Sequence, residues 1–152
     1  MHRPVLFNKT FTMKREDLFE GAIVLARRYK DRKRTRCKII EVRSTTYPLM
    51  NLSVVHQLDI GINYLVPTDD IRPAKITLKG VRELGLEESV WCNKESKRHC
   101  TPKRACFYAD ADVKVLLNSP FGTLVTDDVN RTEVHYMHEL QREIKNLIQL
   151  NS

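Results

Sequence analysis

The chain has 152 residues, of which 41% are apolar and 30% are charged, a composition typical of a soluble globular protein with one ordinary domain or a small barrel and an added lobe. No stretch is long and apolar enough to span a membrane, and the first residues lack the pattern of a secretory signal peptide. The sequence therefore predicts an intracellular, cytoplasmic protein without a membrane partner.

The charge is unevenly distributed along the chain. Residues 1–104 carry 22 Lys+Arg against 12 Asp+Glu, whereas residues 105–152 carry 4 against 7. Such an asymmetry suggests a face that attracts nucleic acid or acidic peptides, although a solvated surface without a single ligand explains a modest excess equally well.

The four cysteines are expected to be thiols, because nothing in the sequence points to export. Cys92, His99, Cys100 and Cys106 lie close together in the sequence and form a weak zinc candidate. Their gaps differ from the paired ligands, such as Cys-x-x-Cys, that structural zinc sites use. We therefore expect no metal and no cofactor.

The first part of the chain predicts a series of short strands. Residues 1–20 form a lead-in, and residues 21–29 predict a buried strand because β-branched residues follow a glycine. A very basic turn follows. Residues 36–44 predict a second strand, whose apolar residues change face between Ile39 and Ile40. A bulge or a strong bend produces such a change.

The next residues complete a small barrel. Residues 44–51 predict a loop, and residues 53–59 predict an alternating strand in which Val54, His56 and Leu58 share a face. His56 is expected to be a packed or rim residue. A further strand then leads to a short helical closure at residues 67–73, bounded by prolines. This arrangement describes an SH3-like barrel over residues 21–73.

The later residues predict a second lobe at 105–152, connected by a linker and a basic loop at 74–104. Gly80 and Gly85 limit any helix in the linker to about two turns. Two strands are predicted at 112–118 and 122–128, and a final helix follows. Its apolar stripe predicts a core-packing face, with a dimer or partner-helix surface as the alternative. The stripe consists of Met137, Leu140, Ile144, Leu147 and Ile148.

The order and spacing of the first strands resemble a Tudor domain. The matching pieces are the glycine-led strand at 21–26, the turn at Asp31, the strand entry at 36–39, the corner at 59–62 and the closure at 70–73, which together cover about a third of the chain. The second lobe is similar to the staphylococcal-nuclease-like lobe of extended Tudor domains, in particular those of Yb-like and related Tudor proteins of animal piRNA silencing. Extended Tudor domains normally also have nuclease-like strands before the barrel, for which residues 1–20 are short.

This resemblance implies a mainly β fold with α, in which an SH3-like Tudor barrel is joined to a partial staphylococcal-nuclease-like α/β lobe that ends in a C-terminal helix. Ordinary Tudor domains of this group bind dimethylarginine in a cage of aromatic rings. Here Gln57, Ile60 and Ile62 stand at cage positions, and the nearby rings are only Tyr29, Tyr47 and Tyr64. We therefore predict weak or absent affinity for methylarginine.

The implied function is a non-catalytic module that binds an unmethylated peptide or protein partner, such as an arginine-rich tail of a silencing protein, in perinuclear granules of the cytoplasm. Isoleucines at the cage positions suggest an apolar binding patch, although they can equally cover the barrel mouth or pack on the second lobe. The expected binding residues are Tyr29, Gln57, Asp59, Ile60, Ile62 and Tyr64.

The alternative function is the binding of RNA or another nucleic acid by the basic turn, because phosphate contacts need only Lys and Arg. No aromatic residue is interleaved in residues 30–36 of this turn to stack bases, which weakens this alternative. An enzyme is not expected, since phosphodiesterases with a His-x-Thr element need two of them and this chain has one, at His99. The basic residues concerned are Arg27, Arg28, Lys30, Arg32, Lys33, Arg34 and Arg36.

Overall fold

Two antiparallel β-sheets and a C-terminal helix make up the computed structural model, which describes residues 13–28, 31–46, 49–88, 104–110, 112–118, 123–127 and 129–150. The predicted mainly β architecture with a final helix is confirmed. The chain divides into two compact units, Met1–Ala74 and Lys75–Ser152. No helix among the described residues has the length and apolar character needed to cross a membrane.

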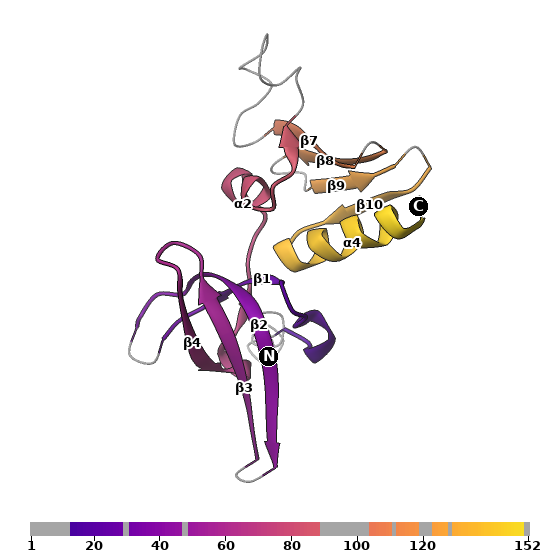
Figure 1. The fold of residues 1–152 in the computed structure, drawn as a ribbon. Coiled ribbons are helices and arrows are strands. Elements are labelled where there is room, and N and C mark those ends of the chain that lie inside the picture. The colour runs from indigo at the N-terminus through magenta and orange to yellow at the C-terminus, as the bar shows by residue number, and fades with distance from the viewer. Residues whose placement is uncertain are drawn as a thin grey trace, which may run out of the picture. The chain divides into compact units, whose positions relative to one another are not determined.

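The first unit contains a five-stranded sheet in the order β4-β3-β2-β1-β5, so that β4 and β5 are its edges (Figure 1). A short 3-10 helix precedes the sheet, and another one connects β4 to β5 as the predicted closure. The elements are η1 (Arg15–Asp17), β1 (Ile23–Ala26), β2 (Thr35–Thr46), β3 (Leu49–Gln57), β4 (Ile62–Pro67), η2 (Thr68–Asp70) and β5 (Arg72–Pro73).

A bulge in β2 explains the change of face that the sequence predicts. The register between β2 and β3 shifts between Ile39 and Glu41, which leaves Ile40 without a partner. Ile39 is fully buried, whereas Ile40 is 38% exposed. The loop predicted at residues 44–51 is wrong, because residues 44–46 and 49–51 continue the two strands. Threonines at 45 and 46 favour a strand, and Pro48 and Asn51 concealed this preference.

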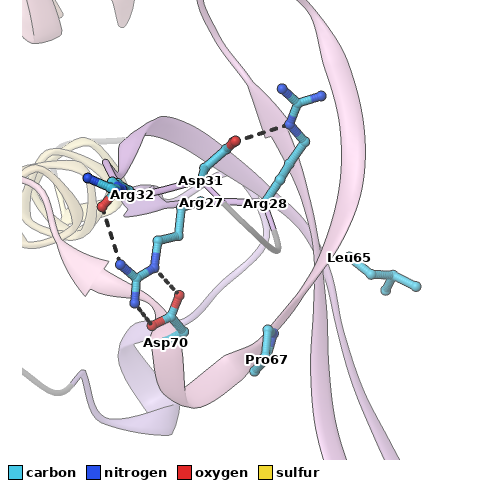
Figure 2. A pocket seen from close by; sticks show the side chains of 7 residues that line it. All are labelled: Arg27, Arg28, Asp31, Arg32, Leu65, Pro67 and Asp70. Carbon is cyan, nitrogen blue, oxygen red and sulfur yellow. Dashed lines mark hydrogen bonds and ion pairs between the residues drawn. The ribbon is translucent and has the colours of Figure 1, made fainter.

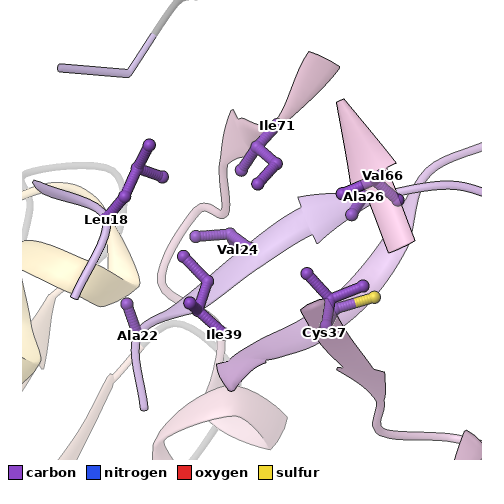
Figure 3. Close-up of a cluster of buried hydrophobic side chains, with 9 residues drawn as sticks. Leu18, Ala22, Val24, Ala26, Cys37, Ile39, Val66 and Ile71 are labelled. Atoms are coloured by element: carbon purple, nitrogen blue, oxygen red, sulfur yellow. The ribbon is translucent and has the colours of Figure 1, made fainter. Parts of the chain in front are cut away.

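The core of the first unit lies inside the bent sheet (Figure 3). Leu18 extends this core beyond the strands, and Gly21, at φ +91°, connects it to the sheet by donating its N–H to the Ile39 carbonyl at 2.7 Å. Each large aliphatic side chain buried in this way contributes about 1.5–3 kcal/mol. The buried cluster consists of Leu18, Ala22, Val24, Ala26, Cys37, Ile39, Val55, Val66 and Ile71.

The alternation predicted for β3 is confirmed, but the face of Val54, His56 and Leu58, which the sequence indicates as the apolar one, is not the buried face, because the pairing with β2 turns the other face to the core. Val55 and Gln57 lie opposite Ile39 and Cys37, so they face the core together with Ser53. The other face is partly exposed, and there the Nδ1 atom of His56 lies 2.6 Å from the Oδ1 atom of Asn63. His56 is therefore a rim residue that contacts a neighbouring strand.

The second unit contains a five-stranded sheet in the order β10-β9-β8-β7-β6. The strands predicted at 112–118 and 122–128 are confirmed as β8 and β9, whereas β6, β7 and β10 were not predicted. Residues 119–122 between these strands, where Ser-Pro-Phe-Gly predicts a hairpin turn, lie outside the described residues. The elements are α2 (Leu78–Glu83), β6 (Glu87–Glu88), β7 (Arg104–Asp110), β8 (Val113–Asn118), β9 (Thr123–Thr126), β10 (Arg131–Val134) and α4 (Met137–Leu150).

Both helices among the described residues of the second unit begin with a side-chain cap. Thr77 Oγ1 accepts the N–H of Gly80 at 3.0 Å at the start of α2, which ends before Gly85 at φ +78°, as the predicted two-turn limit requires. At the start of α4, Glu139 Oε1 accepts the N–H groups of His135 and Tyr136, each at 3.0 Å.

The apolar stripe of α4 packs on β8, β9 and β10 of this sheet. Four residues of the predicted stripe are buried, namely Met137, Leu140, Ile144 and Leu147, and Ile148 is half-buried. The prediction of a core-packing face is therefore confirmed.

Candidate functional site

A cluster of ion pairs joins the closing helix η2 to both ends of the segment between β1 and β2. Arg27 follows β1 and donates to Asp70 through two nitrogens, from Nε to Oδ2 at 3.0 Å and from Nη2 to Oδ1 at 3.2 Å. Arg34 precedes β2 and donates from Nη2 to Oδ1 of Asp70 at 2.8 Å and from Nε to its carbonyl at 3.0 Å. We call these three residues the Asp70 cluster.

The Asp70 cluster is partly buried, and its electrostatics favour an ionised carboxylate. Burial favours the neutral form, but the hydrogen bonds from Arg27 and Arg34 and the charges of both guanidinium groups outweigh it, so that the pKa of Asp70 lies below its ordinary value. The basic segment is thereby fixed to η2, and two of its arginines have a structural role.

Beside the Asp70 cluster lies an open hollow of about 530 Å³ (Figure 2). One wall comes from the basic segment, where Arg28 pairs with Asp31 at 3.3 Å and Arg27 donates to the Arg32 carbonyl at 3.3 Å. The opposite wall comes from β4. We call this space the arginine hollow, and it is lined by Arg27, Arg28, Asp31, Arg32, Leu65, Pro67 and Asp70.

On the side of β4, the arginine hollow is lined by Pro67 and by the strand at Leu65, whose side chain points away from the hollow in Figure 2. The three lining arginines outnumber the two lining aspartates. Arg34, which shares Asp70, and the exposed Lys33 add further positive charge nearby. The surroundings of the hollow therefore carry net positive charge.

The corner between β3 and β4 exposes two of the predicted peptide-binding residues. Ile60 is 54% exposed and Ile62 is 37% exposed. Gly61 between them has φ +72°, as its predicted role in the corner requires, and donates its N–H to the Gln57 carbonyl at 2.8 Å. We call Ile60 and Ile62 the isoleucine corner.

No protein-family model, curated protein or solved structure matches this chain. The interpretation of the site therefore depends on the geometry of the first unit. That geometry offers two neighbouring surfaces at β4, the isoleucine corner at its start and the arginine hollow toward its end.

The other predicted peptide-binding residues have contacts of their own. Gln57 is buried, and its Nε2 donates to Asp59 Oδ1 at 2.8 Å. The Tyr64 hydroxyl lies 3.3 Å from Cys37 Sγ, at the edge of the core. Tyr29 lies outside the described residues. Of the predicted set, the structure thus leaves Ile60 and Ile62 as the exposed apolar pair.

Tyr64 and Cys37 form a neutral pair. Burial, together with the hydrogen bond to Cys37, raises the pKa of Tyr64 well above its usual range. Burial also raises the pKa of the Cys37 thiol, so this sulfur is not poised as a nucleophile. Among the described residues of the first unit, the aromatic side chains are Phe19 and Tyr64, too few rings for a cation cage there.

The basic residues predicted to bind nucleic acid divide by their contacts. Arg27 and Arg34 belong to the Asp70 cluster, and Arg28 pairs with Asp31. Arg32 and Lys33 are exposed, Arg36 is half-buried in β2, and Lys30 lies outside the described residues. Three of these residues therefore form ion pairs with aspartates, and the exposed Arg32 and Lys33 do not belong to these pairs.

The zinc candidate falls largely outside the described part of the chain, which includes only Cys106 of its four residues. Burial raises the pKa of this half-buried thiol. Within the described ranges, no group of three or more His, Cys, Asp or Glu side chains lies together in a way that could hold a metal ion.

Sequence reasoning missed Asp70 and the arginine hollow. A signal was present, because Asp69 and Asp70 stand in the predicted closure and the basic segment begins and ends with arginines. The sequence pattern does not specify which of the seven basic residues pairs with which acidic residue, since the pairing depends on how the sheet bends.

Proposed function

We propose that the first unit is a non-catalytic binding module that takes an unmethylated peptide segment of a protein partner at the isoleucine corner. The observation that carries this proposal is the exposure of two isoleucines at one corner. Of the four large apolar side chains that are exposed in the described part of this unit, Ile60 and Ile62 stand two positions apart at the turn into β4, whereas Leu65 lies on the other face of that strand and Ile40 on the β2 bulge. Removing such side chains from water contributes about 25 cal/mol per Å² of apolar area.

The chemistry of the unit supports binding rather than catalysis. The Cys37 thiol has a raised pKa and is buried, and the His56 ring contacts the Asn63 amide. Neither arrangement gives an activated nucleophile with an adjacent base, which covalent catalysis requires.

The cellular setting that we propose is a small-RNA silencing assembly of the piRNA type. Its support is the resemblance of residues 21–73 to a Tudor domain. An arginine-rich tail is a poor match for the positive surroundings of the arginine hollow, so charge favours a partner segment that is neutral or acidic.

The test of this function is a selection of binders from a displayed library of random linear peptides, with the whole chain immobilised. Selected peptides are then synthesised and titrated against the chain and against two variants. The double variant I60D/I62D is expected to weaken binding by about tenfold or more, as loss of a central apolar contact does. The matched control is I40D, because Ile40 is 38% exposed but lies on the β2 bulge. The proposal would be contradicted if I60D/I62D and I40D lost peptide affinity equally, or if no peptide were selected.

The second prediction concerns methylation of the ligand. Peptides with symmetric dimethylarginine and with unmodified arginine are expected to bind equally weakly, because the described cage positions hold Gln57, Ile60 and Ile62 instead of rings. Fluorescence titration of both peptides measures the ratio of their dissociation constants. A strong preference for the methylated peptide would show that a cage exists.

A further inference from the structure

The outer edge of β4 is an unusual sheet edge in this protein. Among the described strands, β4 pairs only with β3, so half of its backbone N–H and C=O groups point away from the sheet. Exposed edges are normally shortened or charged, because they otherwise pair with other chains. β4 has six residues, Ile62–Pro67, and none of them is charged.

The other three edge strands differ from β4 in this respect. β5 and β6 have two residues each. β10 has four residues and carries Arg131 and Glu133. The usual protection is therefore present at three edges and limited at β4 to Pro67, which lacks a backbone N–H at the end of the strand.

The arginine hollow lies beside this edge, with which no described strand other than β3 pairs. Leu65 and Pro67 of β4 line it on one side, and Arg28 and Arg32 line it on the other. Its volume of about 530 Å³ falls within the range of sites that hold ligands. An added strand would lie roughly 5 Å from β4, and its side chains would point alternately to opposite faces.

From these observations we propose that the partner segment binds as an additional β-strand on the outer edge of β4 and that it is acidic, with carboxylates directed at Arg28 and Arg32. This inference rests on the proposed function and specifies its binding mode and ligand chemistry. A segment that covers β4 would contact the isoleucine corner at one end and the arginine hollow near the other. A strand of that length spans roughly 20 Å.

An acidic peptide fits this site better than RNA does. Among the described residues, no aromatic side chain lines the arginine hollow to stack a base. Arg27 and Arg34 already bind Asp70, so few cations are left for the series of phosphate contacts on which nucleic-acid binding depends, whereas a peptide needs only one or two. The backbone edge of β4, in contrast, is a specific partner for another peptide backbone.

The charge test uses a synthetic peptide from the selection described above and compares R28E/R32E with K38E/R43E. Both double variants change the net charge equally, and both contain an exposed arginine that pairs with a nearby acid, since Arg43 pairs with Glu41 at 2.8 Å. Of the four residues altered in these variants, Arg28 and Arg32 line the hollow, whereas Lys38 and Arg43 do not. We expect R28E/R32E to weaken binding by about tenfold or more and K38E/R43E to leave it within about twofold.

A third variant tests the sign of the effect. D31N removes an acid from the arginine hollow and releases Arg28 from its ion pair, so the acidic peptide is expected to bind more tightly. Circular dichroism of every variant verifies that the sheets are retained.

The backbone test uses N-methylated versions of the same peptide. In an added strand, alternate amides face β4, so methylation of one alternate set is expected to abolish binding while methylation of the other set is tolerated. The inference is overturned if both sets are tolerated, if the selected peptides lack acidic residues, or if R28E/R32E behaves like K38E/R43E.

These outcomes separate the two proposals. If I60D/I62D abolishes binding while the charge and backbone tests fail, the peptide-binding function stands and strand addition is wrong. If no peptide is selected, both proposals fail. If a labelled single-stranded RNA binds instead and R28E/R32E abolishes that binding, the site belongs to nucleic acid and the inference is overturned.

Discussion

The two five-stranded sheets bury their cores in different ways. The second sheet places one face against α4, whose apolar stripe supplies four buried side chains. The first sheet bends around its own core, and the polar Asp70 cluster fixes the segment after β1 to the closing helix. In the second unit the helix covers one face of the sheet. In the first unit the strand β4 leaves an edge beside a charged hollow, where a ligand can bind. This contrast is why we assign binding to the first unit.

The largest expected effect tests how far the second unit depends on its helix. Leu140→Ala removes a fully buried side chain of α4 and leaves a cavity, which is expected to lower the free energy of unfolding by about 2–5 kcal/mol. Leu150→Ala is the matched control in the same helix, because Leu150 is 71% exposed. Urea denaturation measures both changes.

Hydrogen exchange then shows whether the loss is confined to one unit. If the two units are stabilised separately, Leu140→Ala lowers amide protection in β8, β9 and β10 and leaves β1 and β2 unchanged. An equal loss of amide protection in both sheets would show that the two units are not stabilised separately.

The next effect concerns the first unit. Asp70→Asn removes the charge that holds Arg27 and Arg34, and it is expected to cost about 1–2 kcal/mol, a range lowered by the partial exposure of all three side chains. Asp69→Asn is the control, since Asp69 is exposed and accepts from Arg72 only through its carbonyl. Equal stabilities for the two variants, measured in urea, would show that the Asp70 cluster does not fasten the sheet.

Much of the architecture could be predicted from the sequence, because local residue patterns determine it. The glycine-led strand, the bulge near Ile40, the closure before β5 and the stripe of α4 each follow from residue periodicity or from a proline or glycine. The short strands β6 and β10 were missed, because Glu87, Glu88, Arg131 and Glu133 read as polar loop residues. Pairing with a neighbour, rather than intrinsic preference, makes them strands.

The candidate site was less accessible. The sequence placed Ile60 and Ile62 at cage positions but left open whether they are exposed or packed, and the structure shows that both are exposed. The burial of Gln57 was not anticipated, since it follows from its position opposite Cys37. The arginine hollow depends on contacts between residues far apart in the sequence, such as Arg27 and Asp70, and no local pattern specifies such a contact.

The smallest expected effect is the pH dependence of the first unit. The pKa of Asp70 is below its ordinary value of 3.8 in the folded chain, so between the two values the unfolded chain binds a proton that the folded chain does not. Its contribution to the free energy of unfolding is therefore complete above the ordinary pKa and declines as the pH falls through the folded pKa. Asp70→Asn lacks this proton site, and the stability difference between it and the unaltered chain should shrink on acidification. Asp69→Asn should keep the full dependence. Urea denaturation over a series of acidic pH values measures the stability of the unaltered chain and of both variants. If the stability difference between Asp70→Asn and the unaltered chain stays constant as the pH falls, the two arginines do not lower the pKa of Asp70.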